Sequence, residues 1–595
     1  MFLRPQIRKK DGKEHTYWSV VENKRLHDGR VVQRQVLYLG EVNDSQRAAW
    51  RKTLAAHTPG SDATSATAQI ALFPHDRPAP AADERIVRIR LDQLSLHHPR
   101  QWGGCWLALE LYRQLGLDSF FAQHLPASRK GTRWDQILKV LVTQRLLAPG
   151  SEWQLHRDWF ERTALADLLG GDFGLAEIHK LYATQDQVLP LKEKLFDHLR
   201  DQWRDLFGAK YEVLLYDLTS TYFETDTPDD PADPRRHGYS RDHRPDCPQV
   251  VIALVVTPEG FPLAYEILPG NTADNTTLKS FLAKIEARYG KAQRVWLMDR
   301  GIPTEAVLEQ MRASEPPVNY LVGTPKGALT ALEKELLERP WETVREGVQV
   351  KLLPQEGEVY VLARSAGRVD KERAIRRKKL RRLLERLHEL RRQLPERDKL
   401  LMALGAAKKE AGRFYALLNI TVPAADQAVS AETFCFRINR ARLRVVRRRE
   451  GRYLLRSNLT GRTPAELWTF YMQLVQVEEA FKNLKGDLRV RPVYHQKLER
   501  IEAHILVAFL AYTLHVCLRQ RLKAVAGGLT SRAVLEKFCA VQMVDVHLPT
   551  TDGRTVILTR HTQPEKEVQV LLEQLHLTLP EQPPPKISAA AVLAL

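Results

Sequence analysis

The spacing of hydrophobic residues changes once along the chain, near residue 208. Between residues 102 and 206 apolar positions recur at helical spacing, most clearly from Trp134 to Arg145, and Ala148-Pro149-Gly150 ends that helix. From residue 209 onward, short apolar runs are bounded by turn residues, a pattern typical of buried strands. The sequence therefore predicts a helical region followed by a mixed α/β region.

A second helix is expected directly after the first. In Ser151-Glu152-Trp153-Gln154 a serine is followed three residues later by glutamine, the spacing of a capping box that satisfies unpaired N–H groups at a helix start. Two helices joined by a tight turn would form a helix-turn-helix. The motif is compatible with DNA recognition and equally with plain scaffold.

The mixed region has the predicted order βββαβαβ. Two of its apolar runs, Val213–Tyr216 and Val295–Met298, are each followed by an aspartate. The remaining predicted elements are strands over 249–256, 261–268 and 318–323 and helices near 276–289 and 303–313. This order is that of an RNase H-like core, in which a late helix carries a third acid.

An inserted domain is expected before that helix, because roughly 140 residues separate the strand predicted over 318–323 from the helix predicted over 468–485. An ordinary loop is far shorter. Strands are predicted near 348–353, 359–363, 434–438, 443–447 and 452–455, with a long helix over 370–394. Leucines 380, 383, 387, 390 and 394 predict a short coiled-coil seam on that helix. Its other faces hold eight basic residues that suit either a solvated surface or a stripe that contacts phosphates: Arg376, Arg377, Lys378, Lys379, Arg381, Arg382, Arg391 and Arg392.

These patterns predict an α+β multidomain protein with an RNase H-like α/β catalytic core interrupted by an insert. The segments at both ends add a basic β unit, a linker, a buried helix over 501–520, a hairpin near 544–559 and a helix near 565–575, with ordered structure ending at 580–586. The expected divisions are 1–56 (β unit), 57–84 (linker), 85–208 (helical, DNA-binding), 209–325 (core, first part), 326–460 (insert), 461–525 (core, last part) and 526–595 (C-terminal hairpin, helix and tail).

The charge balance favours a polyanionic partner. The 595 residues have a formal charge of +18, with 44% hydrophobic and 27% charged residues, as in a globular nucleic-acid-binding protein. The five cysteines are far apart and lack zinc-site spacing, which fits a reduced, cytoplasmic compartment. The longest apolar run, Ile505 to Leu518, is too short to span a bilayer and is expected to be a buried helix, so no membrane segment is predicted.

Three carboxylates are candidates for a catalytic metal site. Asp217 and Asp299 follow strands, and Glu478 lies within the late helix. Carboxylates placed in this way can hold two Mg²⁺ ions for in-line attack on a phosphodiester. Each acid alone has an ordinary structural explanation, such as a turn-capping aspartate, but the three together favour catalysis. Glu479 points about 100° away from Glu478 on a helix and is the weaker candidate ligand.

Tyr471, Glu478 and Lys485 are seven residues apart, hence on nearly one helix face. The segment that follows is dense in residues suited to DNA phosphates: Lys482, Lys485, Arg489, Arg491, His495, Lys497 and Arg500. Tyr471 and Lys485 are interpreted as contacts to DNA-end phosphates, with helix packing as the alternative for Tyr471. The polar loop from His237 to His243 is expected to contact DNA or solvent.

The spacing Tyr471-x2-Leu474-x3-Glu478-x6-Lys485 resembles the Tyr-Arg-Glu-Lys signature of DDE-type bacterial insertion-sequence transposases of the IS-four-like group, with leucine in place of arginine. Tyr216–Thr221, Asp299-Arg300-Gly301 and Arg491–His495 also resemble a branch of that group, and the similarity extends loosely from residue 1 to about 580. Because Leu474 stands at the position of the signature's arginine, any DNA contact made by that arginine in the family is not assigned to this leucine. Arg489 or Arg491 could make it instead.

The resemblance implies a catalytic and metal-ligand set of Asp217, Asp299 and Glu478, two Mg²⁺ ions for which Mn²⁺ may substitute, and Arg300 among the DNA contacts. It also implies recognition of terminal inverted repeats on double-stranded DNA, strand cleavage and strand transfer to target DNA, and a homodimer that bridges two ends. A bacterial cytoplasmic protein, associated with the nucleoid when bound to DNA, is expected. A metal-dependent nuclease without strand transfer and an inactive DNA-binding descendant are the alternatives; an RNA-binding structural protein would not explain the two strand-end aspartates.

Overall fold

The computed structural model describes residues 1–10, 13–25, 31–56, 87–170, 172–273, 283–285, 294–299, 303–324, 332, 335–336 and 339–588. Its chain divides into two compact units. Unit 1 comprises Met1–Tyr211, Asp217–Thr272 and Gln476–Leu595, and unit 2 comprises Glu212–Tyr216 and Ala273–Val475. The predicted linker over 57–84 and most of the predicted helix over 276–289 lie outside the described residues.

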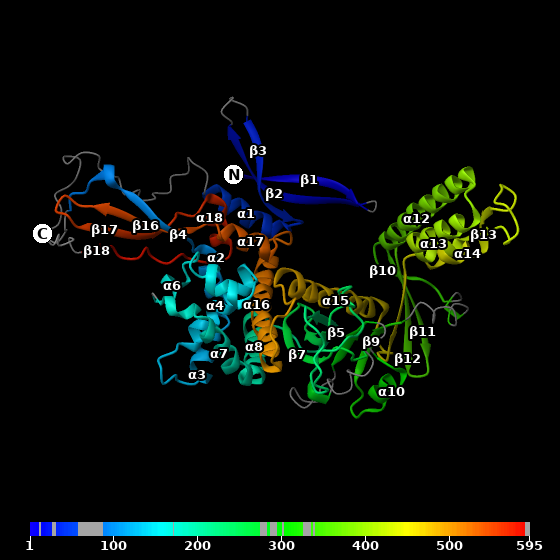
Figure 1. Cartoon of the computed structure of the whole chain (residues 1–595), viewed down its shortest axis with the longest axis horizontal. Helices are drawn as coiled ribbons and strands as arrows, with labels where there is room; N and C mark the ends of the chain where they lie inside the picture. The colour runs from blue at the N-terminus through cyan, green and yellow to red at the C-terminus, as the bar shows by residue number, and fades with distance from the viewer. Residues whose placement is uncertain are drawn as a thin grey trace. The chain divides into compact units, whose positions relative to one another are not determined.

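Unit 1 is built mainly from helices around one long buried helix, α16 (Leu498–Val525). The α16 side chains from Ile505 to Leu518 are all buried, and α4 (Trp134–Leu147) and α7 (Ile178–Val188) pack against it (Figure 1). The other helices are α1 (Asp44–Ala56), α2 (Gly103–Gln114), α3 (Leu117–His124), α5 (Glu152–Gln154), α6 (Leu165–Leu168), α8 (Lys192–Phe207), α17 (Ser531–Phe538) and α18 (Lys566–Gln574).

α16 is the one helix among the described residues that is long and apolar enough to cross a membrane by length and composition. Its most apolar window is 94% buried inside the structure. Burial of this kind is the mark of a core helix, and the buried helix expected over 501–520 is confirmed.

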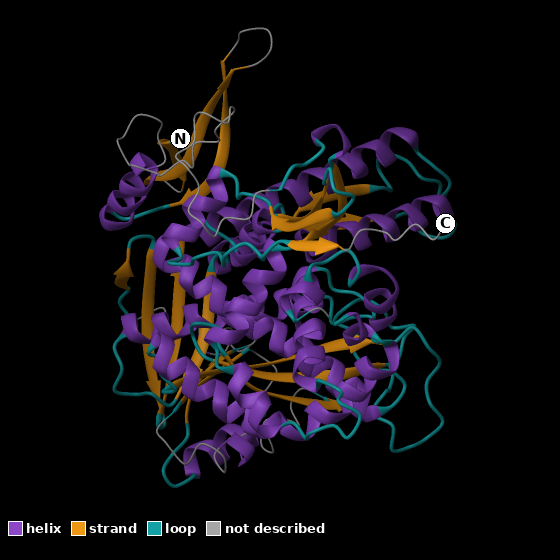
Figure 2. Ribbon diagram, turned by 90° about the vertical axis from the view of Figure 1, so that its left-hand side faces the viewer, coloured by secondary structure: helices purple, strands orange, loops and turns teal. Residues whose placement is uncertain are grey.

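The N-terminal β unit is an antiparallel sheet in the order β1-β2-β3, made of β1 (Phe2–Lys10), β2 (Lys13–Arg25) and β3 (Val31–Gly40). It is tied to the end of α16, since the Gly528 N–H donates to Leu39 O at 2.7 Å and Trp50 Nε1 to Val525 O at 3.2 Å. Helix α1, which carries Trp50, was not predicted. Figure 2 shows these strands in orange.

A second sheet of unit 1 has the order β18-β17-β16-β4. Its middle strands, β16 (Gln542–Pro549) and β17 (Thr555–His561), form the hairpin expected near 544–559, and α18 matches the helix expected near 565–575. β4 (Ser95–Gln101) and β18 (Lys586–Ser588) flank the hairpin and were not predicted. The expected end of ordered structure at 580–586 is wrong, because β18 continues the sheet by pairing with β17.

The predicted helix-turn-helix is only partly present. The Ser151 Oγ accepts a hydrogen bond from the Gln154 N–H at 3.2 Å, as the capping box requires, but α5 is a single turn continued by the wider helical turn Leu155–Trp159. Helix α4 is buried around most of its circumference, from Ile137 to Leu146. A helix buried in this way cannot lie in a DNA groove, so α4 is scaffold. Contact between DNA and the following turn, which carries the exposed Trp153, stays a prediction.

The large sheet contains every strand predicted for the mixed region. Within unit 2, residues 213–216 of β5 (Val213–Tyr222) pair in parallel with β8 (Val295–Met298), and β8 pairs in parallel with β9 (Asn319–Gly323). The order continues as β9-β15-β12-β11-β10, through β15 (Arg452–Ser457), β12 (Glu358–Ser365), β11 (Val348–Gln355) and β10 (Glu342–Arg345). Within unit 1, residues 217–222 of β5 precede β6 (Gln249–Val256) and its antiparallel partner β7 (Pro262–Pro269).

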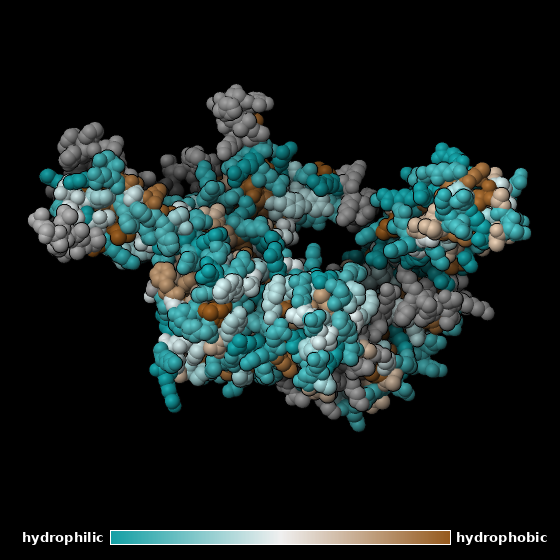
Figure 3. Space-filling model, viewed as in Figure 1, coloured by the Kyte–Doolittle hydropathy of each residue, from teal (hydrophilic) through white to brown (hydrophobic). Residues whose placement is uncertain are grey.

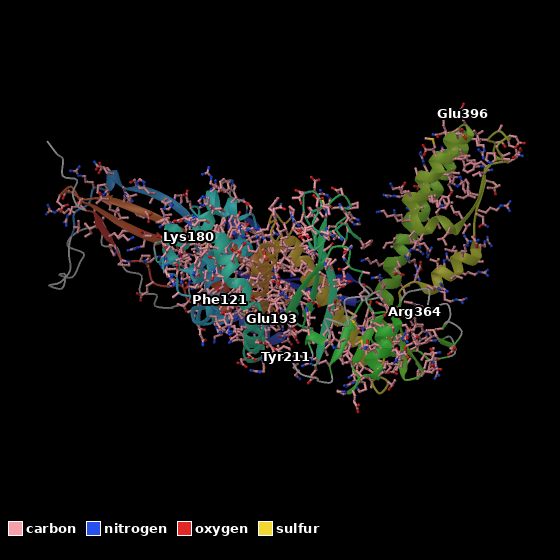
Figure 4. The ribbon with its side chains drawn as sticks, turned by 60° about the horizontal axis from the view of Figure 1, so that its bottom comes forward. Phe121, Lys180, Glu193, Tyr211, Arg364 and Glu396 are labelled. Carbon is pink, nitrogen blue, oxygen red and sulfur yellow. The ribbon has the colours of Figure 1, made fainter. Side chains whose placement is uncertain are left out.

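The rest of the insert is a module with a hydrophobic core of its own. Two helices, α12 (Ala366–Gln393) and α13 (Arg397–Ala411), pack through Leu380, Leu383, Leu387 and Leu390 of the predicted seam against Leu400 and Leu404. The module is completed by β13 (Leu418–Thr421), β14 (Cys435–Ile438) and α14 (Arg440–Arg449). Figure 4 shows Glu396 at the tip between α12 and α13, away from Arg364 on β12.

The strand expected over 443–447 is wrong, because these residues lie in α14. The Asn439 Oδ1 caps the helix by accepting a hydrogen bond from the Arg442 N–H at 2.9 Å. Leu443 and Val446, three residues apart, pack together against the module core. Spacing by three places both on one helix face, whereas a strand would point them to opposite sides.

Candidate active site

Two of the candidate ligands directly follow paired positions on neighbouring strands. Tyr216 of β5 is paired with Met298 of β8 in parallel register, and the next residues along the chain are Asp217 and Asp299. Both strands are anchored by burial, since Leu214, Leu215 and Tyr216 are buried, as is all of β8. Asp217 is half-buried and its Oδ1 accepts the Leu218 N–H at 2.8 Å, while Asp299 is exposed.

The third candidate, Glu478, is an exposed residue of α15 (Pro464–Lys482). The helix continues into a wider helical turn, Asn483–Asp487. The segment after this turn runs back beside β5. The Val490 N–H donates to Leu484 O at 3.1 Å, and the Val493 N–H donates to Tyr222 O at 3.2 Å. The second bond ties the segment that follows the Glu478 helix to β5, the strand that contains Asp217.

Lys485 lies in that wider turn, so its side chain points in a different direction from the one that a regular α-helix would give it. Its Nζ forms an ion pair with Asp242 Oδ1 at 3.0 Å, and Arg491 contacts the same oxygen. The Asp242 side chain is only 5% exposed. Two cations expected to contact DNA phosphates are thus held by a buried carboxylate, and the loop from His237 to His243, expected to contact DNA or solvent, supplies it.

The electrostatic surroundings of Lys485 connect it to the site. Burial lowers the pKa of Lys485 to about 8, and the charge of Arg241 acts in the same direction. The Asp217 carboxylate opposes the shift and favours the ammonium form. Lys485 therefore lies within electrostatic reach of a candidate metal ligand, and we interpret it as a residue that adjusts the charge beside Asp217.

Other residues of the basic segment remain at the surface. Lys482 and Arg489 are exposed, and the Arg489 backbone has a φ of 41°, unusual for a residue with a side chain. A cleft of about 460 Å³ in unit 1 is lined in part by Arg489, Arg491, Trp153 and Tyr494. Trp153 and Tyr494 are 57% and 63% exposed, so this cleft combines basic groups with accessible rings.

Tyr471 packs among aromatic rings. Its ring lies 5.2 Å from that of Tyr453 and 5.3 Å from that of Trp468, centroid to centroid. The packing alternative for Tyr471 therefore has direct support, and a contact with DNA remains a prediction. Arg300 lies outside the described residues.

His495 was expected among the DNA contacts, but it belongs to a buried polar cluster. The Glu152 Oε1 is 3.2 Å from His495 Nε2 and 3.7 Å from His504 Nδ1, and it accepts a hydrogen bond from Gln185 Nε2 at 2.6 Å. Arg145 NH2 lies 3.4 Å from His504 Nδ1, and its NH1 donates to Arg489 O at 3.3 Å. The cluster joins α4, α5, α7 and α16 to the segment that carries Arg489 and Arg491.

Within the described residues, Glu152, His495 and His504 are the group whose potential ligand atoms lie within 4.8 Å of one another. Arg145 is fully buried beside them, and its charge already balances that of Glu152. A divalent cation there would leave a buried excess of positive charge. We therefore interpret the cluster as structural. Burial and the charge of Arg145 lower the pKa of His504 to about 4, which keeps this histidine neutral near pH 7.

Comparison with known proteins identifies the class. Residues 208–514 match the family model of the transposase DDE domain. This match covers more than half of the chain, and the chain belongs to that family. It is a phosphodiester-cleaving and phosphodiester-transferring enzyme, and enzymes of this family depend on divalent metal ions.

The N-terminal region narrows the assignment. Residues 3–67 match the N-terminal domain of IS1634 family transposases, and the protein is a DDE-type insertion-sequence transposase. Comparison with curated proteins finds no match. Among solved structures, the "Cryo-EM structure of piggyBac transposase synaptic complex with hairpin DNA (SNHP)" has a TM-score of 0.34 and 8% identity, over 73% of this chain and 79% of that chain.

Proposed function

We propose that Asp217, Asp299 and Glu478 hold two Mg²⁺ ions, for which Mn²⁺ can substitute, and that the protein uses them to cleave and join DNA strands at the ends of its insertion sequence. The observation that carries the proposal is the placement of Asp217 and Asp299 directly after the paired residues Tyr216 and Met298 on parallel strands. A hydrogen bond from the Val493 N–H, in the segment that follows the Glu478 helix, to Tyr222 O of β5 supports the inclusion of Glu478.

The strand order supports an RNase H-like core. In the order β7-β6-β5-β8-β9, the first three strands of the core are consecutive in sequence, and β8 and β9 are added beyond β5. β6 and β7 are antiparallel, whereas β5, β8 and β9 are parallel. Strands β10, β11, β12 and β15 lengthen the same sheet, whereas the module from α12 to α14 of the proposed insert has a hydrophobic core of its own.

The donor set suits the proposed metal. All three side chains offer carboxylate oxygens, the ligands that Mg²⁺ prefers, and none offers sulfur or imidazole. Bound ions would activate a water or a 3′-hydroxyl and stabilise the leaving oxygen. The protein's own contribution is to orient the acids from rigid elements and to place positive charge near them, with Lys485 held by Asp242 and the exposed Lys482 and Arg489 available to phosphates.

The proposed partner is double-stranded DNA, comprising the terminal inverted repeats and the target. The cleft bordered by Arg489, Arg491, Trp153 and Tyr494 offers charge for the backbone and rings on which bases can stack. Cleavage at two ends followed by joining requires two active sites in one complex, so we propose a homodimer as the working assembly.

The experiment compares Asp217→Asn, Asp299→Asn and Glu478→Gln with the wild-type protein on a labelled duplex that carries the terminal repeat, in Mg²⁺. Each variant should lose cleavage by at least about a thousandfold while it still binds the duplex, because a carboxamide is a poor ligand for Mg²⁺. Glu499→Gln, at an exposed glutamate of α16, is the matched control and should cleave normally.

The outcomes separate the alternatives. Cleavage followed by joining in the wild-type protein supports the transposase, cleavage without joining supports a nuclease, and binding without cleavage supports an inactive descendant. A variant that cleaves at the wild-type rate would remove its residue from the ligand set.

A further inference from the structure

Helix α14 carries a dense cluster of positive charge in unit 2. Its ten residues, Arg-Ala-Arg-Leu-Arg-Val-Val-Arg-Arg-Arg, include six arginines and no acid, and none of the ten is buried. Arginines four residues apart, such as Arg440 and Arg444, repel each other on a helix surface. The helix therefore carries a density of like charge that its own sequence does nothing to offset.

The packing of α14 fixes which face carries that charge. Leu443 and Val446 pack against the module core. Arg440, Arg444 and Arg447 are exposed, and at 100° per residue they fall within about 60° of one another, on the flank of the helix beside Leu443 and Val446, with Arg444 farthest from that apolar pair. A rise of 1.5 Å per residue spreads the three arginines over about 10 Å along the helix axis.

These arginines differ from others in the same module. On α12, Arg368 pairs with Glu372 at 3.1 Å, Arg373 with Asp370 at 3.5 Å and Arg386 with Glu389 at 2.8 Å. Within the part of the chain that the structure describes, no carboxylate lies within ion-pair distance of Arg440, Arg444 or Arg447. Of the basic residues expected to form a stripe on α12, Arg376 is buried and paired with Glu450 at 2.5 Å. Arg440, Arg444 and Arg447 of α14, by contrast, are exposed guanidinium groups.

We propose that the exposed face of α14 binds the sugar–phosphate backbone of duplex DNA. A row of guanidinium groups complements a line of phosphates, with which arginine forms paired hydrogen bonds. The surface of the module is largely hydrophilic in Figure 3, where α14 belongs to the right-hand part of the view.

This inference rests on the proposed function for its partner, since the DNA is either the flank of the terminal repeat or the target. Both sources present the same phosphates. The duplexes used in the test tell them apart.

The test measures DNA binding by the full-length chain in EDTA, on the Asp217→Asn background, as a function of salt concentration. Arg440→Gln, Arg444→Gln and Arg447→Gln are combined in one variant. Because each phosphate contact contributes about 0.9 to the slope of log K against log salt, the slope should fall by about 2 to 3. The matched control, Arg373→Gln with Arg386→Gln, removes two acid-paired arginines and should leave the slope unchanged.

A triple change of the same three arginines to lysine keeps the charge and should restore the slope. If the glutamine variant has a smaller salt slope on an unrelated duplex as well as on the repeat, the bound DNA is the target. If its slope falls only on repeats with a long flank, the bound DNA is the flank. An unchanged slope in a glutamine variant that retains the wild-type circular dichroism spectrum would overturn the proposal. Cleavage plays no part in this readout, so failure of the catalytic proposal would be seen separately.

Discussion

Two groups of basic residues, one in each unit, have opposite surroundings. Around Asp242 in unit 1, Lys485 and Arg491 share one buried carboxylate. On α14 in unit 2, Arg440, Arg444 and Arg447 face solvent without an acid among the described residues. A net charge of +18 is therefore not one uniform property. Cations that are buried and paired hold elements in position, whereas exposed and unpaired cations are available to a polyanion.

The sharpest way to test the first half of this contrast is Asp242→Ala. The substitution leaves Lys485 and Arg491 without their shared carboxylate, and removal of one member of a buried ion pair costs about 3–5 kcal/mol in the free energy of unfolding. Urea denaturation of the full chain would measure the loss. Asp246→Asn breaks a pair with Arg244 whose acid is 61% exposed, and should cost much less because solvent screens that pair. Equal losses in the two variants would contradict the contrast.

For the buried cluster around Glu152 we expect a smaller effect on the free energy of unfolding, and one that depends on pH. The pKa of His504 is about 4 in the folded protein and about 6.5 when unfolded. A depressed pKa means that the stabilisation is complete above pH 6.5 and is lost as pH falls towards 4, by about 3 kcal/mol. His504→Asn should remove most of this loss between pH 7 and pH 4.5, as measured by urea denaturation midpoints. A variant with the wild-type pH dependence would contradict the assignment.

The smallest stability effect is expected on α14. Replacement of Arg440, Arg444 and Arg447 by glutamine removes no ion pair and keeps good helix formers, so the free energy of unfolding should stay within about 0.5 kcal/mol of the wild type. Thermal denaturation would measure it. A loss as large as that of Asp242→Ala would mean that these arginines support the fold instead of binding a partner.

Local patterns were sufficient for much of the fold. Apolar runs located β5, β6, β7, β8 and β9, and the leucine spacing on α12 located the faces that pack against α13, except that Leu394 ends the helix and is 45% exposed. Helix α14 was misassigned because arginines dominate it and hide a short pair of apolar positions, Leu443 and Val446. The strand β18 was not predicted, because it forms by pairing with β17, a tertiary contact that the proline-rich sequence of the tail does not indicate.

The candidate site was predictable where a residue's role depends on its own element, and not where it depends on a distant partner. The apolar runs Val213–Tyr216 and Val295–Met298 indicated Asp217 and Asp299. The expected strand end is wrong for Asp217, which lies within β5 because that strand continues to Tyr222. The pairing of Lys485 with Asp242 joins residues 243 positions apart, and no spacing rule reaches that far. The same holds for His495, whose partner Glu152 comes from the helical region. Exposed and buried basic residues look alike in sequence, so the DNA-contact set could not be divided between them.

The most direct test of the catalytic proposal is a switch of metal preference at one ligand. Asp299→Cys replaces a carboxylate by a thiolate, which binds Mg²⁺ poorly and softer ions such as Mn²⁺ better. Strand cleavage of a duplex that carries the terminal repeat would be measured in each metal. The account predicts that the variant is inactive in Mg²⁺ and regains cleavage in Mn²⁺, while Glu499→Cys behaves as the wild type. Full activity of Asp299→Cys in Mg²⁺ would contradict a metal site built on Asp299.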